Sequence, residues 1–382
     1  MREALVRHRC DALVCAQPRH VLMLSGHWPV VGNAWAVATK DGRVLLIVPE
    51  DELEPATTGW ADAVYTFRAV SLDRLESALV AVREPLGKAL EVAGAETIAY
   101  EAEGSLEPST YVSQFNYGAA GPAVLHDLAP RARLFDADAW LARLRVRKTR
   151  AELEHMRTVA TVARAAYEQG VAAIRPGLTE RDVASAFEAA FESGIPGDAR
   201  GRAFFYCMSG ANAAESNRAY QRTRSRRIER GDVVIVHCNS VIGGFWTDLT
   251  RTYVLGKESE LVIRLEAIAA ARAAAIAHVA PGVEARAVDA AARAVLEAYG
   301  FGPEFRTPTG HGVGFAAIDH DELPRLHPIS KDVLEAGMTF NIEPGCYRRG
   351  LYGMRHGDMI AVAPEGCEVL SPFQTEPAAL VI

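Results

Sequence analysis

The stretch GDVVIVHCNSVIGGFWTDLTRTY, residues 231–253, decides how the second half of this chain folds. Side chains of a strand alternate between two faces, so Val233, Ile235 and His237 share one face and Cys238 lies on the other. The apolar row on the first face therefore ends in an imidazole. The Gly243-Gly244 pair predicts a tight turn, after which the chain returns to Asp248. We therefore predict a β-hairpin that brings the imidazole of one strand to face the carboxylate of the next.

The composition indicates a soluble globular protein with two domains, because the chain has 382 residues, 49% hydrophobic and 23% charged. A net charge of −7 argues against nucleic acid as a partner. The charged first residues and the absence of a run of about 18 apolar residues predict neither a secretion signal nor a membrane span. Six dispersed cysteines without a CxxC pair predict reduced thiols in the cytoplasm.

The first third of the chain alternates between β and α patterns. DALVCAQ and VLMLSG predict short strands, and the apolar runs on either side of Asp41-Gly42 predict a hairpin. Residues 71–87 predict a helix. A composition shift in FDADAWLARLRVRKTRAELEHM predicts a long amphipathic helix, so we place a domain boundary close to Asp138. The expected domains are 1–138 and 139–382, and the fold class is α/β.

The second domain contains an internal repeat. IRPGLTERDVASAFEAAFESG (174–194) matches VAPGVEARAVDAAARAVLEAYG (279–300), each a Pro-Gly break followed by a helix that ends at glycine. The strands GDVVIVH (231–237) and GMTFNIE (337–343) follow in the same order, and His237 then corresponds to Glu343. We predict two related α/β halves with a pseudo-twofold axis, each contributing a hairpin to a shared site.

Between these halves lies TPTGHGVGFAAIDHDELP, residues 307–324. Glycines around His311 allow the backbone to approach neighbouring strands, so this imidazole can enter a narrow site. His320 follows nine residues later. Simpler interpretations stay open: His237 as a satisfied core histidine, Asp248 as a turn cap, and the neighbouring aromatic residues as core.

These motifs together resemble the pita-bread metallohydrolases, which include Xaa-Pro aminopeptidases, prolidases, methionine aminopeptidases and the metal-free creatinases. Residues 1–138 resemble the creatinase/prolidase N-terminal domain through DALVCAQPRHVLMLSG. Residues 145–382 resemble the catalytic domain through VRKTRAELEHMR, SGANAA, GGFWTDLTRTY, GHGVG and FNIEPGCY. The resemblance implies an N-terminal α/β domain followed by a pita-bread domain, and commonly a homodimer.

The peptidases of this family hold two divalent metals with two Asp, one His and two Glu. Asp248, His311 and Glu343 match three of these positions. His237 stands where the first Asp is expected, and Gly357 stands where the second Glu is expected. Two further residues bear on the resemblance: Asn217 replaces a histidine near the substrate, and His320 resembles a second histidine displaced by two residues.

Only two carboxylates therefore remain for a metal, which matches the charge of one divalent ion. We predict a single Zn, Mn, Fe or Co ion, or none, with the ligands His237, Asp248, His311 and Glu343. If residues 355–359 form one strand, His356 and Asp358 share a face opposite to Gly357 and cannot replace the missing Glu without a bulge.

The resemblance implies a metal-dependent hydrolase of amide bonds, of the Xaa-Pro peptidase type, acting on short peptides. The predicted catalytic residues are His311, His320 and Glu343, and the predicted substrate contacts are Asn217, Trp246 and Arg355. One alternative is a creatinase-like, metal-free hydrolase of a small C–N substrate with His237 or His311 as the base. Another is an inactive relative that binds a small molecule.

Overall fold

The computed structural model describes residues 1–382 except 31–33, 73–74, 103–119, 218–222 and 318–322. The chain divides into two compact units, Met1–Arg145 and Val146–Ile382. Asp138, the predicted boundary, is the first residue of helix α7 (Asp138–Val146).

The first unit is built on one six-stranded sheet with the strand order β4-β3-β2-β1-β5-β6. The strands are β1 (Ala12–Cys15), β2 (Trp35–Thr39), β3 (Val44–Pro49), β4 (Ala63–Phe67), β5 (Thr97–Tyr100) and β6 (Arg133–Asp136). Apolar clusters pack on both faces, which is why the central strands β1, β2 and β3 consist of almost continuous buried residues, whereas the edge strands β4 and β6 are more exposed. The helices of this unit are α1 (Arg2–His8), α2 (Pro18–Ser25), α3 (Leu53–Ala56), α4 (Ala78–Ala81), α5 (Arg83–Ala93), α6 (Ala120–Leu128) and α7.

The hairpin predicted around Asp41-Gly42 is confirmed, because β2 and β3 pair antiparallel. The strand predicted at VLMLSG is wrong, since these residues belong to α2. Pro18 opens this helix, and Gly26 closes it in the left-handed conformation with φ 75°. The short apolar run was ambiguous, and these two terminal residues were the signal for a helix. The helix predicted over 71–87 starts only at Ala78.

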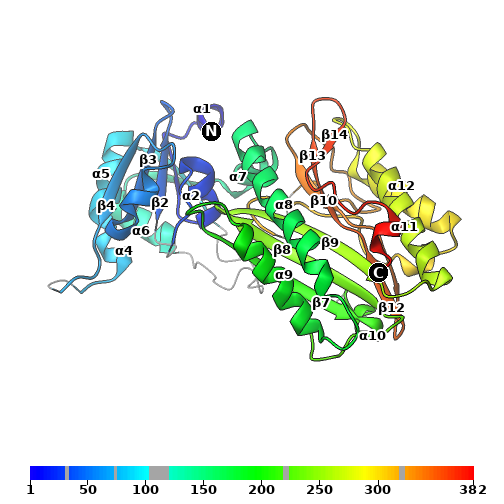
Figure 1. Cartoon of the computed structure of the whole chain (residues 1–382). Helices are drawn as coiled ribbons and strands as arrows, with labels where there is room; N and C mark the ends of the chain where they lie inside the picture. The colour runs from blue at the N-terminus through cyan, green and yellow to red at the C-terminus, as the bar shows by residue number, and fades with distance from the viewer. Residues whose placement is uncertain (31–33, 73–74, 103–119, 218–222, 318–322) are drawn as a thin grey trace. The chain divides into compact units, whose positions relative to one another are not determined.

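The second unit begins with helices α8 (Arg150–Gly170) and α9 (Glu180–Gly194), which pack on a three-stranded sheet (Figure 1). Its strands are β7 (Gly201–Ser209), β8 (Val233–Ile242) and β9 (Phe245–Val254), in that order. The long amphipathic helix predicted near this boundary corresponds to α8, and a shorter helix, α7, precedes it. Thr149 and Glu152 form a capping box that starts α8, so α7 and α8 are separate helices.

The second half of this unit repeats the pattern, as predicted. Helices α11 (Ser259–Ala277) and α12 (Ala285–Ala298) pack against each other beside the sheet β10-β13-β14 (Figure 1). These strands are β10 (Thr339–Ile342), β13 (Asp358–Val362) and β14 (Cys367–Val369), and a separate hairpin is formed by β11 (Gly345–Arg348) and β12 (Tyr352–Arg355). An isolated bridge between Thr250 and Gly357 connects the two halves.

Short elements complete the described chain: α10 (Gly210–Ala213) and the 3-10 turns Glu50–Glu52, Val171–Ala173, Gly302–Glu304 and Pro377–Leu380. Among the helices in the described ranges, none has both the length and the apolar character needed to cross a membrane.

Candidate active site

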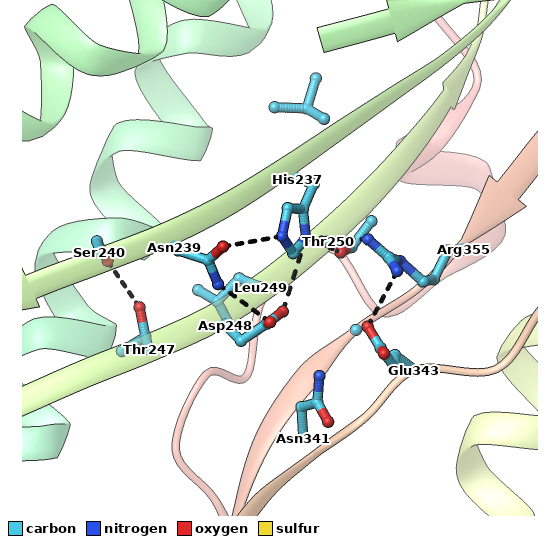
Figure 2. A network of polar contacts seen from close by, with 12 residues as sticks. His237, Asn239, Ser240, Thr247, Asp248, Leu249, Thr250, Asn341, Glu343 and Arg355 are labelled. Atoms are coloured by element: carbon cyan, nitrogen blue, oxygen red, sulfur yellow. Dashed lines mark hydrogen bonds and ion pairs between the residues drawn. The ribbon is translucent and has the colours of Figure 1, made fainter. Parts of the chain in front are cut away.

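The hairpin of β8 and β9 presents the first group of site residues on one face, as Figure 2 shows. The register pairs His237 with Thr250 and Asn239 with Asp248. His237 is therefore a diagonal neighbour of Asp248 and does not face it directly, with 3.7 Å between Nδ1 and Oδ1. The residue directly across from Asp248 is Asn239, whose amide nitrogen donates a hydrogen bond of 3.0 Å to Asp248 Oδ2.

Both ring nitrogens of His237 have partners. Nε2 lies 3.2 Å from the Asn239 side-chain oxygen, which can only accept, so Nε2 carries the proton. Nδ1 lies 2.9 Å from Thr250 Oγ1 and 3.0 Å from Arg355 Nη2, and the guanidinium can only donate. His237 is thus a neutral imidazole whose lone pair is directed to Arg355.

His311 has the opposite tautomer. Its Nδ1 lies 3.0 Å from the Gly312 carbonyl oxygen and must donate to it, which leaves the lone pair on Nε2. Nε2 lies 3.7 Å from Asp248 Oδ2 and 3.9 Å from Glu343 Oε1. The Asn341 side-chain oxygen accepts from the His311 backbone nitrogen at 2.8 Å, which directs its amide nitrogen to His311 Nε2, 3.2 Å away, and so holds the ring beside the carboxylates.

Arg355 brings a positive charge into this group. Its Nη1 lies 3.3 Å from Glu343 Oε2, opposite the contact with His237 (Figure 2). The Arg355 backbone is held in both directions by Thr252, whose hydroxyl accepts from the Arg355 nitrogen and donates to the Arg355 oxygen at 2.8 Å each. β12 therefore carries Arg355 at a fixed backbone position, and the contacts with Glu343 and His237 place its guanidinium in the site.

Burial dominates the electrostatics. Asp248 is 1% exposed, and burial, with the nearby charge of Glu343, raises its pKa to about 8. Burial also lowers the pKa of His237 well below its ordinary value, and the charge of Arg355 lowers it further. Both shifts favour the neutral forms of Asp248 and His237 in the metal-free site.

Gly357 adds no side chain, and its neighbours do not replace one. Residues 355–359 do not form one strand, because β12 ends at Arg355 and β13 begins at Asp358. Asp358 accepts a hydrogen bond of 2.6 Å from Arg251 and is also bound by Arg272. His356 lies 3.3 Å from the same carboxylate. Asp358 and His356 therefore belong to a buried structural ion pair behind the site.

A cavity of about 640 Å³ opens onto these side chains. Its described lining includes His237, Asp248, His311, Glu343 and Arg355, together with Asn217, Ser216, Arg325, His327, Ile329 and Lys331. The structure thus brings Asn217 and Arg355, two of the three predicted substrate contacts, to the cavity. Trp246 does not appear in this described lining and stacks instead on Phe204, with 6.4 Å between ring centroids. His320 lies outside the described residues.

Comparison with known proteins identifies the family. The model of metallopeptidase family M24 matches residues 154–364. The chain belongs to metallopeptidase family M24. It is 27% identical to the Xaa-Pro dipeptidase of Pyrococcus furiosus over 96% of this chain and 94% of that protein. A protein named "Probable dipeptidase PepE" of Mycobacterium bovis is 33% identical over 59% of this chain and 58% of its own length.

Solved structures agree with this assignment. The prolidase from Pyrococcus horikoshii OT3 superposes with a TM-score of 0.77 at 25% identity, covering 97% of this chain and 96% of that one. The X-Pro aminopeptidase from Thermotoga maritima has a TM-score of 0.81 at 20% identity and shares the fold over 98% of both chains. The pita-bread fold and the class of metal-dependent peptide hydrolase are confirmed for this M24 member.

M24 membership implies dependence on a divalent metal, and Asp248, His311 and Glu343 carry donor atoms of the kinds that such an ion binds. Asp248 Oδ1 and Glu343 Oε2 are buried and accept no hydrogen bond from any described residue, although Arg355 lies near the latter. The Nε2 lone pair of His311 lies beside both carboxylates, where the neutral Asn341 amide engages it at 3.2 Å, and Nδ1 donates to a carbonyl, as in metal-binding histidines. One His and two carboxylates leave an open coordination position, as catalytic sites require.

The first unit of this M24 member contains a tighter group of donor atoms, from Cys15, His20 and Glu101. Glu101 accepts hydrogen bonds from the backbone nitrogens of Ala16 and Gln17 and contacts His20, and Arg145 contacts the other side of that ring. Hydrogen bonds already satisfy this group, so its role is to anchor the start of α2.

Three residues of the M24 site were missing from the sequence prediction or given another role: Asn239, Asn341 and Arg355. Asn239 and Asn341 lie two residues from His237 and Glu343, so the strand period already put them on the same faces. Nothing in the spacing indicated that Arg355 contacts His237, which lies 118 residues earlier.

Proposed function

We propose that this M24 chain hydrolyses short peptides in the manner of an Xaa-Pro dipeptidase, with one divalent ion held by Asp248, His311 and Glu343. The observation that carries the proposal is that His311 Nε2 lies 3.7 and 3.9 Å from two buried carboxylates. An ion there would have to displace the neutral Asn341 amide, which lies 3.2 Å from the same nitrogen. The names of the dipeptidase relatives support a small peptide as substrate.

His237 takes a different role in this proposal from the predicted metal ligand. Its Nδ1 accepts from Arg355, and a lone pair engaged by a cation's N–H group is not available to a metal. His237 instead orients the guanidinium, while Asn239 orients both His237 and Asp248.

A bound ion would polarise the scissile carbonyl and lower the pKa of a coordinated water. The side chains supply the rest of the chemistry. Glu343 has an oxygen that accepts no hydrogen bond from a described residue, so it can accept a proton from an attacking water. Lys331 lines the same cavity, where positive charge suits the free carboxylate of a short peptide, whereas Arg325 in the lining is already paired with Asp332 at 2.8 Å. A role for His320 in steadying the oxyanion or protonating the leaving group stays a prediction, as does the cytoplasmic homodimer.

Metal quantification paired with turnover tests the proposal. An Xaa-Pro dipeptide and creatine are offered to the purified chain before and after chelation. Chelation should abolish dipeptide cleavage, and His311→Ala should abolish it as well, whereas His278→Ala, at the exposed end of α11, should have no effect. Wild-type turnover by the His311→Ala variant would overturn the assignment. Creatine turnover that resists chelation would favour the metal-free alternative.

A further inference from the structure

A buried carboxylate on helix α12 holds the segment that leads to His311. Asp289 is fully buried, and its Oδ1 accepts hydrogen bonds from the hydroxyl of Thr309 at 2.7 Å and from the backbone nitrogen of the same residue at 3.1 Å. Thr309 is fully buried as well, so water cannot replace either bond. One carboxylate oxygen therefore fixes both the side chain and the backbone of Thr309.

Arg293, one turn further along α12, completes this group. Its Nε lies 2.6 Å from Asp289 Oδ2 and its Nη2 lies 3.1 Å from Oδ1. The same guanidinium donates to the carbonyl oxygens of Thr307 at 2.6 Å and Phe305 at 3.2 Å. We call Asp289, Arg293 and Thr309 the α12 clamp. Because the charge of Asp289 is paired at short range, the clamp acts on the site mainly through position and little through its field.

Thr309 connects the clamp to two of the proposed ligands. Its carbonyl oxygen accepts from the backbone nitrogen of Glu343 at 2.8 Å, and it stands two residues before His311. Asn341 closes the connection from β10, since its backbone nitrogen donates to the His311 carbonyl oxygen at 3.1 Å. A Cβ on Gly310 would lie 1.9 Å from the Asn341 carbonyl oxygen, so this segment lies directly against β10. A shift of Thr309 must therefore move both ligands.

We infer that the α12 clamp positions the ion site: through Thr309 it sets the separation of His311 Nε2 and Glu343 Oε1, and with it the affinity for a divalent ion. The inference rests on the proposed ion site. The two atoms lie 3.9 Å apart. Two ligand atoms that each bind one ion at about 2.1 Å can be at most about 4.2 Å apart, so a small widening would break one of the bonds.

The first half of the M24 domain offers a matched control. Glu180, at the start of α9, is also fully buried and accepts from the hydroxyl and the backbone nitrogen of Ser209 at 2.8 and 2.7 Å. Its other partners are Asn212 and Arg224. None of these three partners is a ligand of the proposed ion, so the loss of this carboxylate removes similar contacts without moving His311 or Glu343.

Isothermal titration of the metal-free full chain with Mn²⁺ tests the inference. Asp289→Asn should weaken Mn²⁺ binding at least about tenfold. Thr309→Val leaves every charge in place and removes the hydroxyl, and should weaken binding at least about threefold. Thr309→Ser keeps the hydroxyl and should stay within about twofold of wild type, as should Glu180→Gln. A merely structural role would lower the thermal midpoint of Asp289→Asn and Glu180→Gln alike and leave the Mn²⁺ affinity of both unchanged.

Hydrogen exchange of the metal-free chain gives a second readout, at the Glu343 amide that donates to Thr309. Asp289→Asn and Thr309→Val should speed this exchange, and Glu180→Gln should not. A Thr309→Val chain that binds Mn²⁺ as tightly as wild type would overturn the inference, because the effect of Asp289→Asn would then be one of charge. Circular dichroism checks folding, and Thr309→Ala replaces Thr309→Val if that variant fails to fold.

The failure of this inference is distinguishable from that of the proposed function. A wild-type chain that binds no Mn²⁺ would overturn the proposed metal-dependent function. In that case the exchange at Glu343 decides on the clamp: faster exchange in Asp289→Asn and Thr309→Val supports the positioning role, and unchanged exchange overturns it. A wild-type chain that binds Mn²⁺, beside clamp variants that bind it equally well, would overturn the inference and leave the proposed function standing.

Discussion

Arg251 offers the sharpest test of what holds the two halves of the M24 domain together. Its side chain is fully buried, with Nη2 2.6 Å from Asp358 Oδ1. Nη1 donates to the carbonyl oxygens of Gly357 at 2.7 Å and Thr250 at 2.8 Å, and the guanidinium lies 3.9 Å from the ring centroid of Phe373. Burial alone would raise the pKa of Asp358, but the charge of Arg251 and the neighbouring His356 and Arg272 bring it well below its ordinary value.

Arg251→Met keeps the length of the side chain and removes all of these donors. Breaking a buried ion pair by removing one partner costs about 3–5 kcal/mol, because the remaining charge stays in a dry environment. Arg272 still binds Asp358 in the variant, so we expect the lower end, about 3 kcal/mol. The loss should concentrate in β9 and β13, which Arg251 connects.

Arg157→Met is the matched control. Arg157 also binds a carboxylate with two hydrogen bonds, to Glu368 at 2.8 and 2.7 Å, but the side chains are 34% and 43% exposed. An exposed pair of this kind contributes less than about 1 kcal/mol. Hydrogen exchange followed by mass spectrometry gives the opening free energy of peptides from β9 and β13 without assuming two-state unfolding. If Arg251→Met lowers that free energy no more than Arg157→Met, burial is not what makes the first pair important.

Three further outcomes follow from the site. Because the pKa of metal-free Asp248 is about 8, Mn²⁺ binding should release nearly one proton per chain at about pH 6.5 and almost none at about pH 9.5. Calorimetry in buffers of different ionisation enthalpy measures the number of protons released. A proton release that does not fall with rising pH would contradict the prediction. Gly357→Ala places a Cβ 3.2 Å from the Thr250 nitrogen, so the free energy of unfolding should fall by about 1–3 kcal/mol and the thermal midpoint should fall with it. An unchanged midpoint in scanning calorimetry would show that the backbone near Thr250 shifts to accommodate the Cβ at no cost. Asn239→Ala removes the hydrogen bonds of Asn239 to His237 Nε2 and Asp248 Oδ2, so amide protection in β8 should fall by about 1–3 kcal/mol, and unaltered exchange would refute the orienting role.

The sequence by itself determined the elements that position the site. Strand alternation and the Gly243-Gly244 turn predicted the β8–β9 hairpin, and the repeated Pro-Gly break predicted the positions of α9 and α12. These signals are local, because the backbone conformation of a few residues decides them. The motifs that indicated the fold family depend on the same short stretches.

The two misassignments at the strands have different causes. The helix at 18–25 was mistaken for a strand although its local signals, Pro18 and Gly26, stand in the sequence. His237 was expected to face Asp248, but alternation fixes only the face of a strand and not its register, and the register puts Asn239 opposite Asp248 instead.

Tertiary structure alone decided the electrostatics of the M24 site. A count of carboxylates in the sequence gave two negative charges, and only the packing of β12 beside β8, with Glu343 close by, brought the guanidinium of Arg355 among them. The tautomers of His237 and His311 were decided in the same way, since each depends on whether the nearest partner donates or accepts. Charge and proton position depend on distances between residues that are remote in sequence, and residue spacing carries no such distances.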